Sequence, residues 1–145
     1  MRDATKKLDN PMAVIGALAK AMYESYGDEV LPVFESVLRE YGYQRGLALR
    51  RKLDDKNFVD RIEAWMAPAF EAGGGKTVEK TLNSITVKGS ACPFNLHGCG
   101  RDLCIALMGF DQGFASALAD HEVTLEIATS LAGGDEDCLV TWSVP

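Results

Sequence analysis

The sequence has no long apolar run. No stretch approaches the roughly 18 apolar residues of a membrane-spanning helix, and the first ten residues, MRDATKKLDN, lack the apolar core of a signal peptide. We therefore expect a cytoplasmic protein that does not enter a membrane. In that reducing compartment its four cysteines are expected to be thiols, thiolates or metal ligands rather than disulfides.

Basic residues are also scarce. The chain has 15 Lys and Arg against 21 Asp and Glu, which gives a formal net charge of −6. A surface that binds nucleic acid must neutralise phosphates with clustered cations. The densest basic run, at residues 45–52, is followed directly by Asp54 and Asp55. The composition therefore argues against nucleic acid as a partner.

Linkers, internal repeats and low-complexity segments are absent as well. A chain of 145 residues with 47% hydrophobic and 25% charged residues has the size and composition of one globular domain. It is long enough to bury a core without help from a disulfide or a metal. We predict a single domain over residues 1–145, with a helical part over 1–72 and a sheet plus a helix over 77–145.

Helical spacing dominates the first half of the chain. Asn10 followed by Pro11 is typical of a helix start, and three helices are predicted, over about 10–27, 28–53 and 55–68. Asp28 is expected to cap the second helix, Asp54 or Asp55 to open the third, and Pro68 followed by Gly73-Gly74-Gly75 to end it. The apolar stripe of the second helix consists of Val33, Val37, Leu38 and Tyr41.

From residue 77 onward the apolar residues alternate with a period of two. This pattern predicts one hairpin over 77–82 and 85–90 and another over 123–131 and 138–144, the latter around the turn Gly133-Gly134-Asp135. A long helix over about 100–119 lies between them. The fold class is therefore α+β, with N-terminal helices and a four-stranded antiparallel sheet built from two hairpins, one face of which is covered by helices.

Thiols are concentrated in the link between the first hairpin and that long helix. Cys92, His97, Cys99 and Cys104 fall within 13 residues of one another, in the kind of segment that displays reactive groups on a rigid frame. Cys92 or Cys99 is a candidate nucleophile with His97 as its base, and Cys99 lies closest to the helix N-terminus, which stabilises a thiolate.

The same thiols are open to two other interpretations. With Cys138, the cysteines Cys92, Cys99 and Cys104 could bind zinc or an iron–sulfur cluster, but their spacing contains no C-x2-C pair. Cysteine is also among the most buried residue types and often only packs, which is the ordinary expectation for Cys104 and Cys138.

Asp111 is the most informative carboxylate. It follows Cys104 by seven positions, so both project from one side of the predicted helix, about two turns and roughly 10 Å apart. That side borders the apolar stripe. An apolar environment would raise the pKa of Asp111, which suits a general acid or base, whereas a carboxylate that reaches the helix margin would have no such role.

The second half of the chain resembles a known family. The likeness rests on Ala91-Cys92-Pro93-Phe94, on the helix that carries Cys104 and Asp111, and on residues 132–138 (AGGDEDC), and it covers roughly residues 85–144. These segments resemble the L-2-amino-thiazoline-4-carboxylic acid hydrolase-like family. The same skeleton also resembles the 4-vinyl reductase domain, a small-molecule sensor module.

The first resemblance implies a cysteine-dependent hydrolase that opens a small cyclic C=N or C–S compound of the 2-amino-thiazoline carboxylate type. It makes Cys92 the nucleophile and gives Asp111 a supporting role. On this leading hypothesis His97 or Asp111 moves protons. The remaining substrate contacts are expected from Phe94, Cys99, Cys104 and Phe110.

The second resemblance implies a non-catalytic module that binds a small molecule or a metal. Sensor domains of this kind often hold zinc through cysteines, and Cys92 and Cys138 match two of those positions, whereas Ser130 stands where the pattern has another cysteine. Zinc or an iron–sulfur cluster is therefore the alternative cofactor. On either hypothesis the partner is a small molecule, and the apolar helices suggest a homodimer.

Overall fold

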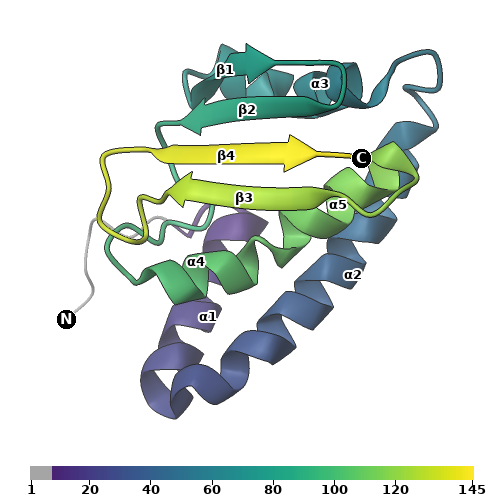
Figure 1. The fold of residues 1–145 in the computed structure, drawn as a ribbon. Helices are drawn as coiled ribbons and strands as arrows, with labels where there is room; N and C mark the ends of the chain where they lie inside the picture. Colours follow the sequence, from purple (N-terminus) through teal and green to yellow (C-terminus); the bar gives the residue numbers. More distant parts are fainter. Residues whose placement is uncertain (1–7) are drawn as a thin grey trace.

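Four antiparallel strands form one sheet in the computed structural model, which describes residues 8–145 (Figure 1). The strands are β1 (Gly75–Lys80), β2 (Ser84–Gly89), β3 (Thr124–Thr129) and β4 (Cys138–Ser143). Their spatial order is β1-β2-β4-β3, so the two hairpins join along β2 and β4. The predicted α+β class and its sheet of two hairpins are confirmed.

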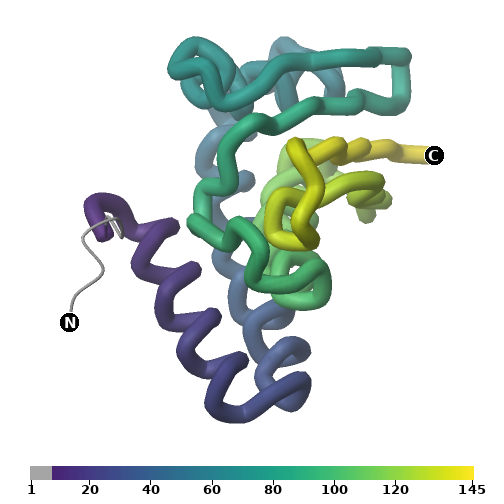
Figure 2. The backbone as a smooth tube through the Cα atoms, turned by 90° about the vertical axis from the view of Figure 1, so that its left-hand side faces the viewer, coloured from purple at the N-terminus to yellow at the C-terminus, as the bar shows by residue number. Residues whose placement is uncertain are grey.

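The helices lie against one face of this sheet (Figures 1 and 2). They are α1 (Pro11–Tyr26), α2 (Leu31–Arg50), α3 (Phe58–Glu71), α4 (Arg101–Leu107) and α5 (Gly109–Ala119), and a 3-10 turn (Gly27–Val30) joins α1 to α2. Figure 1 shows α3 behind β1 and β2, and α5 between the sheet and α2. Within residues 8–145, no helix combines the length and apolar character needed to cross a bilayer.

Alternation along the strands separates a buried face from a polar one. Ile85 and Val87 of β2 and Val140 and Trp142 of β4 are buried in the core beneath the helices. On the other face, the hydroxyl groups of Thr86 and Thr141 pair across the two strands at 2.8 Å. The period-two pattern therefore identified the correct faces.

Two helix starts illustrate where local signals succeed and fail. The side chain of Asn10 accepts a hydrogen bond from the Ala13 N–H at 2.9 Å, as predicted for the cap of α1. The cap of α3 is Asn57, which accepts from the Asp60 N–H at 2.9 Å, and neither Asp54 nor Asp55 opens the helix. Several adjacent residues could cap a helix, and the one that does is decided by where the helix packs.

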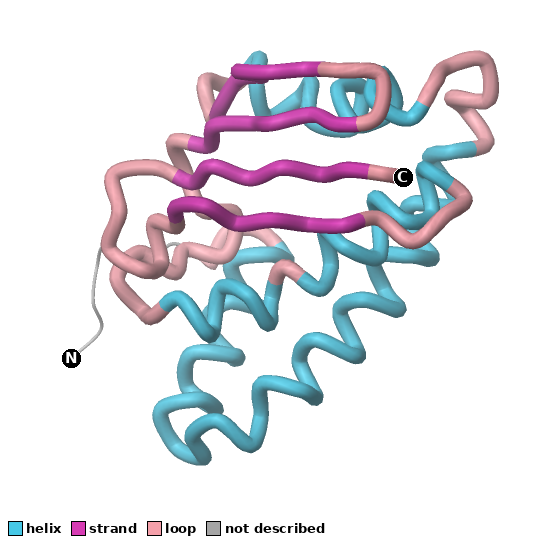
Figure 3. Tube along the Cα trace, in the orientation of Figure 1, coloured by secondary structure: helices cyan, strands magenta, loops and turns pink. Residues whose placement is uncertain are grey.

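Pro68 and the predicted long helix over 100–119 also need correction. Pro68 lies inside α3, which continues to Glu71 and ends just before the predicted glycine run at Gly73. The long helix is two helices separated at Met108, and the break is visible between α4 and α5 in Figure 3. The break directly precedes Gly109, the residue at which α5 begins its close packing on α2.

Backbone-to-backbone packing of α2 against α5 depends on glycine. A Cβ atom on Gly42 would lie 2.1 Å from the carbonyl oxygen of Phe110, and one on Gly113 would lie 2.0 Å from that of Arg39. Gly46 and Gly109 are similarly close to the facing backbone, at 2.6 Å and 2.7 Å. The two helices therefore approach more closely than any side chain would allow.

This glycine contact overturns the predicted apolar stripe of α2. Leu38 is buried, but Val33 and Val37 are 59% and 63% exposed, and Tyr41 is exposed as well. The buried face runs through Leu38, Gly42 and Gly46 instead. A stripe chosen by hydrophobicity misses glycines, because their contribution is the absence of a side chain.

Substitution of Gly42 by Ala tests this contact. The new methyl group would overlap the Phe110 carbonyl, so we expect the free energy of unfolding to fall by about 2–3 kcal/mol, although alanine is the better helix former. Chemical denaturation measures the change. Ser36→Ala, an exposed position of the same helix, should stay within about 0.5 kcal/mol of wild type. Equal effects of the two substitutions would contradict the close approach.

Candidate functional site

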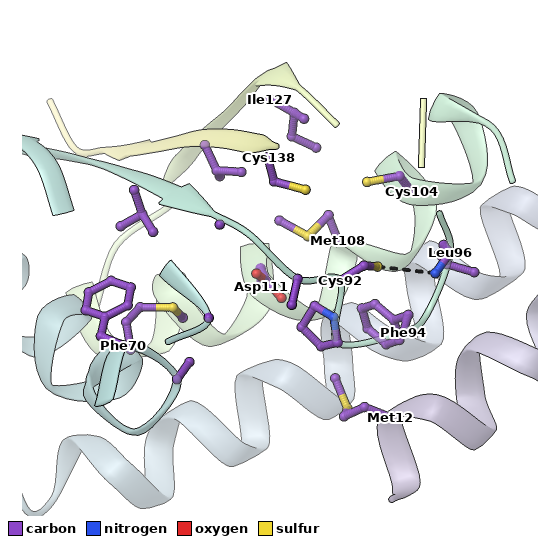
Figure 4. A pocket seen from close by; sticks show the side chains of 18 of the residues that line it. Met12, Phe70, Cys92, Phe94, Leu96, Cys104, Met108, Asp111, Ile127 and Cys138 are labelled. Atoms are coloured by element: carbon purple, nitrogen blue, oxygen red, sulfur yellow. Dashed lines mark hydrogen bonds between the residues drawn. The ribbon is translucent and has the colours of Figure 1, made fainter. Parts of the chain in front are cut away.

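A cavity of about 150 Å³ lies between the buried face of the sheet and the helices. Its wall combines residues from α1, α3, α4, α5 and three strands with the link that follows β2 (Figure 4). Apolar side chains and sulfur atoms make up most of it, among them Met12, Met66, Phe70, Phe94, Met108, Ile127 and Val140. An apolar cavity of this size elsewhere stays dry and takes up a benzene-sized molecule.

The link between β2 and α4 closes one side of the cavity. It is anchored to the turn after β3, because the N–H groups of Gly98 and Gly100 donate to the carbonyls of Leu131 and Ala132 at 3.1 Å and 2.8 Å. Phe94 is buried within this link and lines the cavity. Cys92 is held on the wall by the Leu96 N–H, which donates to its sulfur at 3.4 Å.

Cys104 and Cys138 bring two further sulfur atoms to the same wall (Figure 4). Burial raises the pKa of the Cys104 thiol, against an opposing hydrogen bond with Ser130. Burial likewise raises the pKa of Cys138, although the Leu131 N–H that donates to its sulfur at 3.4 Å acts in the opposite direction. Both thiols are therefore protonated at neutral pH and are poor nucleophiles.

Asp111 is the carboxylic acid of the cavity wall. It lies in the first turn of α5, and Figure 4 shows its carboxyl group beside Cys92 and Met108. Asp111 is half-buried, and protein atoms surround its carboxyl group. This burial raises the pKa of Asp111 to about 7. Among the described residues, the wall includes no lysine, arginine or histidine.

Three of the predicted site residues are not on this wall. The side chain of His97 is exposed, and only its backbone carbonyl contacts the thiol of Cys99, at 3.8 Å. Cys99 packs against the core outside the cavity. Phe110 is buried beside Tyr41 and Phe114, with ring centroids 5.6 Å and 5.7 Å away. Of the proposed catalytic residues, Cys92 and Asp111 therefore share the cavity wall, and His97 does not.

The described residues do not fit a zinc or iron–sulfur site either. Between residues 8 and 145, no group of three or more His, Cys, Asp or Glu side chains is placed to hold a metal ion. Ser130, where the sensor pattern has cysteine, is fully buried, and its hydroxyl oxygen accepts from the Gly133 N–H at 3.3 Å. The proposed ligands Cys92, Cys104 and Cys138 are wall residues, and a metal receives no support from their arrangement.

The acidic tail of the motif has a structural role. Asp135 accepts the Ser130 N–H at 2.8 Å, and Asp137 accepts the hydroxyl of Thr129 at 2.8 Å. These bonds close the turn between β3 and β4, which delivers Cys138 to the cavity. Sequence reasoning missed the wall residues Met66, Phe70 and Trp142, because nothing in their local pattern distinguishes a cavity wall from a filled core.

Fold and cavity together define a class: an α+β domain with an apolar hollow between its sheet and its helices. No protein-family model matches the sequence, and no curated protein matches it. Solved structures do match. The phenol-responsive sensory domain of the transcription activator PoxR, in complex with phenol, superposes with a TM-score of 0.68 at 15% identity, over 98% of this chain and 83% of that one.

A second solved structure has the same fold. Subunit 3 of the trafficking protein particle complex from Naegleria fowleri, covalently bound to palmitic acid, matches with a TM-score of 0.61 at 16% identity, over 91% of each chain. At these identities the likeness establishes a shared fold. The fold is thus one that also occurs in a small-molecule sensory domain.

Substitution of Asp111 by Asn tests its burial. The folded-state pKa of about 7 lies above the unfolded value of about 4, so the stability that the protonated form provides is lost as the pH rises through 7. Between about pH 5 and pH 8 we expect Asp111 to cost wild type roughly 2–3 kcal/mol of unfolding free energy. Chemical denaturation at several pH values measures this. The free energy of unfolding of Asp111→Asn should depend less on pH than that of wild type. Asp102→Asn, at an exposed position, should show the same pH dependence as wild type.

Thiol reactivity tests the arrangement of the cysteines. Cys104 is buried and has a raised pKa, whereas Cys99 is half-buried and lies outside the cavity. We expect iodoacetamide at neutral pH to alkylate Cys104 more slowly than Cys99 by at least on the order of tenfold. Peptide mass spectrometry over time measures both rates, and faster labelling of Cys104 would contradict this assignment.

Proposed function

We propose that this protein is a non-catalytic module that binds a small, largely apolar molecule in the cavity between its sheet and its helices. The supporting observation is the cavity itself, about 150 Å³ in volume with an almost wholly apolar wall. Protein interiors are close-packed, and the atoms that line a cavity lack van der Waals contacts on one side. A ligand of matching shape would restore them.

The composition of the cavity wall argues against the hypothesis that this protein hydrolyses a thiazoline carboxylate. A carboxylate substrate needs a cation or several hydrogen-bond donors when it leaves water, and the described wall residues include no cationic side chain. His97 is exposed to solvent away from Cys92, and the thiols of Cys104 and Cys138 are protonated at neutral pH. Binding without turnover accounts for these features better than hydrolysis.

The two structural neighbours carry ligands of different size, and the cavity favours the smaller. PoxR's sensory domain was solved with phenol and the trafficking subunit with covalent palmitic acid. A volume of about 150 Å³ suits a single ring and is too small for a long acyl chain. We therefore place this protein closer in ligand size to the phenol-responsive domain.

Toluene is the probe that tests the proposal, because it has the right size and no polar group. Calorimetry or ligand-detected NMR should give a Kd on the order of 1 mM, and the free energy of unfolding should rise by about 1 kcal/mol at five times that concentration. Gas chromatography should recover the toluene unchanged.

Cys138→Phe should abolish toluene binding, because its ring would occupy the cavity. The matched control is Ile105→Phe, which adds the same ring at a position of α4 that is exposed and does not line the cavity. Circular dichroism would establish that both variants are folded. Failure of wild type to bind toluene, or equal binding by both variants, would refute the proposal.

A further inference from the structure

Few polar side chains lie on the described cavity wall, and none of them carries a positive charge. Apart from the thiols, the polar side chain on the described wall is the carboxyl group of Asp111. No cation matches it, since the described wall residues include no lysine, arginine or histidine. Asp111 can therefore recognise a ligand by hydrogen bonding, and an anionic ligand would find no opposite charge.

Trp142 supplies a donor that the protein leaves without an acceptor. The residue is only 2% exposed, and its Nε1 is a buried polar atom with no hydrogen-bond partner among the described residues. Its ring packs edge-on against Trp65, with centroids 5.9 Å apart. Buried donors in folded proteins are nearly always paired, but protein atoms enclose this nitrogen although the residue lines the cavity. Recognition of a polar group of the ligand therefore falls to Asp111.

Asp111 supplies a carboxyl group on the cavity wall itself. Its position one turn after the break at Met108 places a carboxyl group on a wall otherwise made of hydrocarbon and sulfur (Figure 4). A carboxyl group in such surroundings is costly unless it is hydrogen-bonded. Its retention there is explained if a bound molecule provides the missing partner.

We propose that Asp111 binds an uncharged hydrogen-bonding group of the ligand, such as a hydroxyl, and thereby selects neutral polar aromatic-sized molecules over carboxylates. This inference rests on the proposed function and specifies its ligand class. With a pKa of about 7, Asp111 is protonated in mildly acidic solution and can both donate to and accept from a hydroxyl group.

The charged groups around Asp111 do not alter this behaviour. The titratable groups that share its wall are the thiols of Cys92, Cys104 and Cys138. On α2, which packs against the other side of α5, Glu35 and Arg39 pair with each other at 3.0 Å. On α3, Glu63 pairs with Lys80 of β1 at 2.6 Å. Burial is the one cause that raises the pKa of Asp111, so the ligand meets a carboxyl group that no charge neutralises.

Four ligands that share one ring and one exocyclic carbon test the proposal: toluene, benzyl alcohol, benzylamine and benzoate. Their Kd values are measured by calorimetry at about pH 6 for wild type, Asp111→Leu and Asp111→Asn. The control is Asp102→Leu, an exposed position on α4 that does not line the cavity. Asp111→Asn keeps a hydrogen-bonding side chain and controls for the loss of charge. Asp111→Ala, which also removes the hydrogen bond, replaces Asp111→Leu if the leucine variant folds poorly.

The decisive quantity is the preference for benzyl alcohol over toluene, which is the Kd of toluene divided by the Kd of benzyl alcohol. We expect this ratio to fall about 2- to 10-fold in Asp111→Leu, the effect of one net hydrogen bond, and to stay near the wild-type value in Asp111→Asn and Asp102→Leu. Benzoate should bind wild type more weakly than benzyl alcohol, and protonated benzylamine should bind Asp111→Leu more weakly than wild type, because the variant lacks the carboxyl group with which the ammonium can pair. At about pH 8.5, ionised and hydrated Asp111 should weaken toluene binding to wild type but not to Asp111→Leu.

The outcomes separate this inference from the proposed function. If toluene binds wild type but the preference ratio is unchanged in Asp111→Leu, the role of Asp111 is refuted and the apolar cavity still binds. Benzoate binding at pH 6 as tightly as benzyl alcohol would likewise refute it. If none of the four ligands binds wild type, the proposed function fails and the inference fails with it.

Discussion

The close approach of α2 and α5 is the constraint on which the rest of the molecule depends. Four glycines, Gly42, Gly46, Gly109 and Gly113, place helix backbone where side chains would otherwise stand. This contact holds α5 against α2, and the opposite side of α5 then faces the sheet. There Phe114 stacks on Trp65 at 4.2 Å, and Asp111 reaches the cavity. Any residue larger than glycine on the contact would push α5 toward the sheet and into the hollow.

The chemistry of the cavity follows from what surrounds it. Close packing would ordinarily fill such a hollow, and its described wall of methionine, aliphatic, aromatic and thiol groups offers no cation to an anionic ligand. Burial keeps the thiols of Cys104 and Cys138 protonated and makes Asp111 a weak acid. The same desolvation that makes these groups unsuitable for nucleophilic attack makes them suitable for holding a neutral molecule, which favours binding over catalysis.

The cysteine-rich segment shows how far a motif can be interpreted without coordinates. Its concentration of thiols marked a region that reaches the cavity wall, since Cys92, Cys104 and the distant Cys138 share one cavity. The motif did not reveal that His97 points to solvent or that Cys99 lies outside the cavity. Residues 91–94 and Leu96 line the cavity, whereas Asn95 and His97 are exposed. The link that carries them is anchored by backbone bonds to the turn after β3. Those bonds join segments more than 30 residues apart.

By itself the sequence determined what local physics controls: the cap at Asn10, the period-two strands, the turn at Gly133 and the α+β class, since these depend on neighbours within a few residues. Tertiary structure decided the strand order, the helix break at Met108 and the buried face of α2. It also decided that Asp111 has an apolar environment, because a pKa depends on every atom packed around the group. A cavity belongs to no segment of the chain. It exists only where helices and strands distant in sequence are held apart, and for that reason only the folded protein shows it.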